Sequence, residues 1–72
     1  MTDLTVEVSP VAGGWRVASA GLQDLMFLSG ARAEEKARSL AACLARCGAD
    51  VRLVVQDRRR QVVGTRRYFA LL

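Results

Sequence analysis

Apolar and polar residues alternate with a period of two at the start of the chain, which is the pattern of a β-strand with one buried face. Residues 4–8 read Leu-Thr-Val-Glu-Val, and we expect this strand to end at Ser9 and Pro10. Gly13-Gly14 then supplies a tight turn into a second strand that begins at Trp15. The pattern predicts an N-terminal hairpin in which Trp15 anchors the core.

A second hairpin is predicted near the C-terminus, because residues 51–55 again alternate between apolar and mixed positions. We expect its turn at residues 57–60 and its returning strand over about residues 61–69, with Gly64 marking a bulge or a close backbone approach. Between the two hairpins lies the apolar run 25–28. This run either extends the second strand past a bend or forms a short third strand, and the sequence leaves both open.

The middle of the chain has the three- and four-residue spacing of an amphipathic helix, expected from about Ala31 to Cys47. The residues of its apolar stripe are Ala33, Ala37, Leu40, Ala41, Leu44 and Cys47. Ser29 is the expected N-cap and Gly48 the expected C′ residue. Glu34 precedes Arg38 by one turn, in the orientation that favours an ion pair.

These elements predict an α+β fold of the form β-β-(β)-α-β-β, with a largely antiparallel sheet of four or five strands and one helix packed on one face. The 72 residues form a single small domain, and 51% of them are apolar. A domain of this size has a thin core, so a second copy or another partner would add stability.

Positive charge is concentrated in the last third of the chain. Residues 46–72 carry seven arginines against two aspartates, a net charge of +5, whereas residues 1–45 carry four basic and five acidic residues, a net charge of −1. This asymmetry favours an anionic partner. The candidate binding residues for nucleic acid or an acidic partner are Arg58, Arg59, Arg60, Arg66, Arg67 and Tyr68.

Arginine side chains contact phosphates, a two-stranded ribbon fits the major groove, and Tyr68 can stack on an exposed base. Arg66 and Arg67 must point to opposite faces of a strand, so at most one of them shares a face with Tyr68. In the simplest alternative, the arginines protect an edge strand from aggregation and keep the protein soluble. Another alternative is a homodimeric adaptor, joined through the open sheet face and the apolar tail 69–72, that binds a protein partner.

The residues for catalysis are few, because the chain contains no histidine and the adjacent Glu34 and Glu35 point in different directions on a helix. Cys43 and Cys47 are too few for a zinc site, and we expect both to be reduced and buried beside the leucines of the helix. The sequence therefore predicts a non-enzymatic binding module with no cofactor and no metal.

No apolar run approaches the roughly 18 residues that span a bilayer, and the N-terminus lacks the basic start and apolar run of a signal peptide. A cytoplasmic location without membrane contact is therefore the expectation from the sequence.

The chain also resembles a known family, on the residues Gly14-Trp15-Arg16-Val17, the helix 35–41 (Glu-Lys-Ala-Arg-Ser-Leu-Ala), Gly48-Ala49-Asp50-Val51 and a closing hairpin that ends at Tyr68. In these residues it resembles the small bacterial proteins grouped as domain of unknown function 2188, over most of the chain from about Val6 to Tyr68. The resemblance implies a β-β-α-β-β arrangement. It carries no established activity, so it transfers no functional residues.

Overall fold

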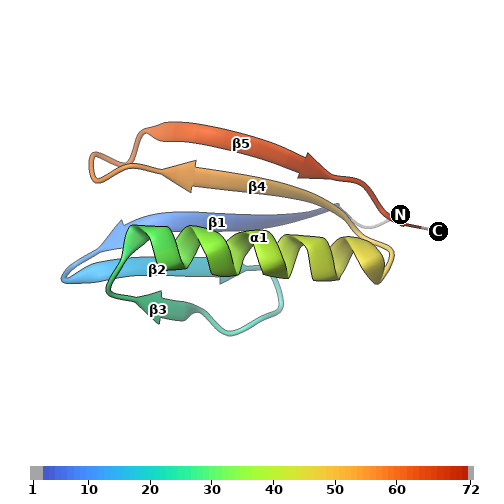
Figure 1. The fold of residues 1–72 in the computed structure, drawn as a ribbon, viewed down its shortest axis with the longest axis horizontal. Coiled ribbons are helices and arrows are strands. Elements are labelled where there is room, and N and C mark those ends of the chain that lie inside the picture. The colour runs from blue at the N-terminus through green and yellow to red at the C-terminus, as the bar shows by residue number, and fades with distance from the viewer. Residues whose placement is uncertain (1–2, 72) are drawn as a thin grey trace.

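Five strands and one helix make up the part of the chain that the computed structural model describes, residues 3–71. In chain order they are β1 (Asp3–Val11), β2 (Gly14–Ser19), β3 (Leu25–Phe27), α1 (Gly30–Arg46), β4 (Asp50–Gln56) and β5 (Val62–Tyr68). The strands form one sheet in the order β3-β2-β1-β4-β5, antiparallel except for the parallel pair β1 and β4. α1 packs across one face of this sheet (Figure 1), which confirms the predicted α+β fold.

The first hairpin differs from the prediction at its turn. β1 does not end at Ser9 and Pro10 but continues to Val11, and the turn consists of the two residues before Gly14. Pro10 is tolerated inside β1 because β4 pairs with β1 only as far as Val8. Beyond Val8, β1 has a neighbouring strand on one side only. The absence of a backbone N–H at Pro10 therefore removes no hydrogen bond to β4. The run 25–28 resolves into a separate third strand, β3, paired with β2.

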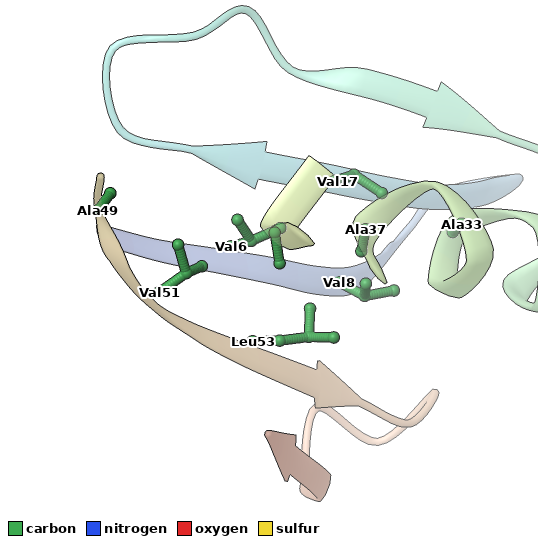
Figure 2. Packing of buried hydrophobic residues seen from close by; sticks show 9 residues of the cluster. Val6, Val8, Val17, Ala33, Ala37, Ala49, Val51 and Leu53 are labelled. Atoms are coloured by element: carbon green, nitrogen blue, oxygen red, sulfur yellow. The ribbon is translucent and has the colours of Figure 1, made fainter. Parts of the chain in front are cut away.

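The core forms where an alanine stripe on α1 meets the central strands. Ala33, Ala37, Ala41 and Ala45 are the buried residues of α1. They face a layer from the sheet that consists of Val6, Val8, Val17, Val51 and Leu53, each at most 4% exposed (Figure 2). A methyl side chain lets the helix lie close to the sheet, so the β-branched valines fill the space between the two layers.

The buried stripe of α1 is rotated relative to the one that the sequence predicts. Leu40 and Leu44 are half-buried and pack against the edge of the core, while Ala45 takes the last buried position. Cys47 was expected in the stripe but is exposed, because α1 ends at Arg46 and Cys47 is the residue that caps it. The stripe therefore follows a strict four-residue spacing on the smallest side chains.

The ends of α1 agree with the predicted caps. The Ser29 hydroxyl accepts a hydrogen bond from the backbone N–H of Arg32 at 3.4 Å, and Gly48 adopts a φ of +101°, where glycine is favoured. The expected pair one turn apart is present, with 3.3 Å between Arg38 Nη1 and Glu34 Oε2. α1 has 17 residues, and within residues 3–71 no helix is both long and apolar enough to cross a membrane.

The C-terminal hairpin turns at the predicted place. The Asp57 carboxylate accepts hydrogen bonds from the backbone N–H groups of Arg59 at 2.8 Å and Gln61 at 3.0 Å, which fixes the turn. β5 is slightly shorter than predicted, and the pairing between β4 and β5 shifts next to Gly64. The bulge alternative is thus confirmed for Gly64, and the close approach is wrong, because no atom lies within 4 Å of the position of an added Cβ.

Gly14 is the glycine that the sheet requires. A Cβ at this position would lie 2.4 Å from the carbonyl oxygen of Phe27, so β3 could not pair with β2 at its present distance. We expect Gly14→Ala to lower the free energy of unfolding by about 1–3 kcal/mol, measured by chemical denaturation. Gly64→Ala is the matched control and should change it by less than about 0.5 kcal/mol. Equal stability of the two variants would contradict the packing of β3 on Gly14.

Candidate nucleic-acid interface

The hairpin of β4 and β5 carries arginines whose charge is not neutralised by nearby carboxylates. Its arginines are Arg52, Arg58, Arg59, Arg60, Arg66 and Arg67. The two aspartates of the hairpin bind backbone groups instead: Asp57 caps the turn, and Asp50 Oδ1 accepts from the N–H of Ala70 at 2.8 Å. Within residues 3–71 the ion pairs are Arg16–Asp24 and Arg38–Glu34, both outside this hairpin. Six guanidinium groups are therefore left without a carboxylate within 4.0 Å in the described chain.

The six residues predicted from the sequence divide between three places. Arg66 and Tyr68 pair with Leu53 and Val51, whose side chains are in the core, so both lie on the helix side of the sheet. The Arg66 guanidinium stacks 5.1 Å from the centroid of the Tyr68 ring. Arg67 lies on the opposite, open face, as the alternation of a strand requires. The prediction that only one of the two arginines shares a face with Tyr68 is confirmed.

Arg52 is a member of this charged surface that the sequence analysis did not select. It pairs with Arg67 across the strands, and Thr5 of β1 is its partner on the other side, so the three residues form one row on the open face. The alternation of residues 51–55 already placed Arg52 on the side away from the core, and this was the available signal. Asp3 and Asp50 line the same hollow of about 260 Å³, so this part of the face carries both signs of charge.

At the turn, three arginines follow one aspartate, and Arg58 has a structural role. Its guanidinium lies 4.6 Å from the centroid of the Trp15 ring, and its Nη1 donates to the carbonyl of Val11 at 3.2 Å. These contacts tie the β4–β5 turn to the β1–β2 turn. Arg59 and Arg60 are exposed beside it, on a turn that Asp57 fixes. The turn therefore presents two arginines to solvent from a rigid base.

Trp15 is half-buried and packs against the core, as expected for an anchor, but it also lines a cleft. This cleft, which we call the Trp15 cleft, has a volume of about 480 Å³ and lies between the β1–β2 turn and the segment 26–28. The sequence did not predict it, because its second wall depends on the pairing of β3 with β2. Most of the surface that lines it is apolar.

The two cysteines are exposed, which contradicts the expectation that they are buried. The reason is the rotation of α1: its sheet-facing positions are the four alanines, so Cys43 points away from the core and Cys47 lies beyond the last turn. No group of three or more residues suited to hold a metal ion occurs within residues 3–71.

No protein-family model, curated protein or solved structure matches this chain. The resemblance to domain of unknown function 2188 therefore stays a prediction, and any function has to be argued from the residues themselves.

Replacement of Arg58 tests its structural role. Arg58→Ala removes the stack on Trp15 and the bond to Val11, and we expect the free energy of unfolding to fall by about 1 kcal/mol. For a domain of this size that corresponds to a fall in Tm of roughly 4–8 °C, which thermal circular dichroism can measure. Arg59→Ala is the control, because it removes the same charge from the neighbouring position; if both variants lower Tm equally, the contact of Arg58 contributes nothing.

Proposed function

We propose that this chain is a small, non-enzymatic, cytoplasmic binding module that binds the phosphate backbone of nucleic acid through the β4–β5 hairpin. One observation supports the proposal above all others: six arginines gather on one hairpin, and within residues 3–71 none of them has a carboxylate partner. Uncompensated positive charge of this density attracts a polyanion and gains free energy from the counterions that the polyanion releases.

The position of the hairpin in the sheet suits an extended partner. β5 is an edge strand, so one side of the hairpin has no neighbouring strand. Arg59 and Arg60 lie at the tip, and Arg52 and Arg67 lie further along the open face. Contacts between guanidinium groups and phosphates along a ribbon carry no sequence information, so the binding should depend weakly on sequence.

Two variants of equal net charge test the proposal. The first changes Arg59, Arg60 and Arg67 to Ala, and leaves Arg58 in place because of its contact with Trp15. The second also changes three basic residues to Ala, and these are the exposed α1 residues Arg32, Lys36 and Arg46. We expect the first variant, but not the second, to lose most of its binding to labelled DNA and RNA in fluorescence anisotropy. Its slope of log K against log salt should become shallower by about 2–3, since each lost phosphate contact accounts for roughly 0.7–0.9.

Equal losses in the two variants would mean that net charge alone attracts the nucleic acid and that the hairpin is not the binding surface. Absence of binding by the unmodified protein at low salt would contradict the proposed function as a whole.

A homodimeric adaptor is the second candidate, and the C-terminal tail supports it. The backbone of the tail is fixed to the domain, with the N–H of Leu71 donating to the carbonyl of Ala45 at 3.0 Å. The side chains of Phe69 and Leu71 nevertheless remain 66% and 61% exposed. The open sheet face gives less support, because its rows contain mainly polar and charged residues. A dimer mass in light scattering that falls to the monomer value in a Phe69→Ser, Leu71→Ser variant would favour this candidate.

A further inference from the structure

We propose that a groove between α1 and β5 binds an acidic amphipathic helix of a partner protein. The groove lies on the helix side of the sheet, whereas most arginines of the β4–β5 hairpin lie at its turn or on the open face. The inference therefore goes beyond the proposed function and does not depend on it.

The sheet is wider than the one helix that covers it within residues 3–71. Its five strands, spaced about 4.8 Å apart, extend over roughly 20 Å, and a helix with its side chains is about 10 Å wide. β5 is the strand that α1 contacts least. Figure 1 shows α1 over β1 and β2, with β5 left uncovered. The helix side of β5 therefore lacks the layer that covers the central strands.

The residues of β5 on the helix side border open space. Gly64 and Arg66 pair with Val55 and Leu53, which belong to the core or pack against it, so both lie on the side of α1. A Cβ added to Gly64 would meet no atom within 4 Å, and Arg66 is exposed. The packing of α1 therefore leaves this part of the sheet accessible.

Two hollows occupy this space. The first has a volume of about 180 Å³ and lies between Arg38 of α1 and Arg66 of β5, with Leu53 and Val55 in its lining. The second has a volume of about 220 Å³ and lies between the end of α1 and the segment 68–71.

One side of α1 forms a wall of both hollows. Arg38 lines the first hollow, and Ala42 and Arg46 line the second. Residues four positions apart lie above one another on a helix, so the hollows follow a single line. Eight residues of a helix extend over about 12 Å, which is the length of roughly two turns of a partner helix. We call the two hollows together the α1–β5 groove.

Much of the lining of the α1–β5 groove is apolar. Leu53 and Val55 lie in the first hollow. Phe69 and Leu71 line the second, although their side chains are 66% and 61% exposed. Phosphate groups gain nothing from apolar surface, whereas the apolar face of an amphipathic helix is stabilised by burial against it. The lining therefore favours a helix over a nucleic acid as the occupant of the groove.

Positive charge borders this apolar surface. Arg46 and Arg66 line the groove, and within residues 3–71 neither has a carboxylate partner. Arg38, the third arginine of the groove, pairs with Glu34. In the described part of the chain, no carboxylate lines either hollow. A helix with acidic residues beside its apolar stripe complements both the charge and the apolar lining.

A second copy of this chain has no such helix to offer. α1 is the one helix within residues 3–71, and its alanine stripe is buried in its own core. The net charge of +4 on each copy also opposes association. The occupant is therefore a helix of another protein.

Nuclear magnetic resonance of the isotope-labelled protein tests the groove with a model peptide. The probe is a peptide of about 14 residues with leucines at three- and four-residue spacing and glutamates at most other positions. Its counterpart has lysine in place of each glutamate. We expect the acidic peptide to shift the backbone amide signals of residues 38–46 and 64–71 in a saturable way. The basic peptide should leave them nearly unchanged, because the arginines of the groove repel it.

Two double variants with the same change in net charge locate the peptide. Arg46→Glu with Arg66→Glu reverses charge in the groove, and we expect about a tenfold loss of affinity for the acidic peptide and a gain for the basic one. Arg32→Glu with Lys36→Glu is the control, since both residues are exposed on α1 and line neither hollow. At physiological salt the control should keep its affinity within about threefold, because distant exposed charges are screened. Ala42→Glu, which keeps every arginine, repeats the test if the first variant does not fold.

Three results would overturn the groove as a site for an acidic helix: shifts confined to the turn 57–61 and the open face, equal shifts from the two peptides, or no saturable shift up to about 1 mM peptide. Equal losses of affinity in the two double variants would overturn it as well. Shifts at the groove that depend on the concentration of the protein alone would assign the groove to a second copy instead. None of these results bears on nucleic-acid binding, which the anisotropy experiment tests through Arg59, Arg60 and Arg67.

Discussion

The contact between the alanine stripe of α1 and the valines of the central strands is the interaction on which the rest of the structure depends. Ala37 and Ala41 are fully buried, and the side chains of Val6, Val8 and Val51 are at most 1% exposed. Short side chains on the helix and branched side chains on the sheet allow close packing of two layers in a chain of only 72 residues. Because α1 crosses the sheet between β3 and β4, β4 runs in the same direction as β1, and the two strands lie side by side as a parallel pair.

The position of the charged hairpin follows from the same packing. With β1 and β4 at the centre, β5 must lie at the edge of the sheet, where few of its side chains are needed for the core. Arginine at positions 66 and 67 therefore removes little apolar surface from the core. Charged side chains on an edge strand also discourage its pairing with other chains. Asp50 and Asp57 form no ion pair with these arginines, and their carboxylates accept hydrogen bonds from backbone N–H groups. The arginines of the hairpin thus leave uncompensated positive charge along the edge of the sheet.

The sequence predicted what depends on neighbours along the chain. Two strand patterns, the Ser29 cap, the Glu34–Arg38 pair and the turn at Asp57 are all local, and the structure contains each of them. Beyond the two hairpins it did not predict the strand order or the parallel pairing of β1 with β4, since these depend on contacts between distant residues. The exposure of the cysteines was missed for a related reason. Leucine, alanine and cysteine together form a broad apolar stripe on α1, and only the valine layer of the sheet selects the alanines as its buried centre.

The parallel pairing of β1 and β4 also explains why an apolar cleft and an arginine turn lie next to each other. In a parallel pair the carboxyl ends of both strands lie at the same end of the sheet. β1 leads into the turn before Trp15 and β4 leads into the turn at Arg58, so the two turns lie at the same end of the sheet (Figure 1). The contact between Arg58 and Trp15, 43 positions apart in the chain, is a result of this topology. An antiparallel pairing of the same two strands would place the two turns at opposite ends of the sheet, and Arg58 could not reach Trp15.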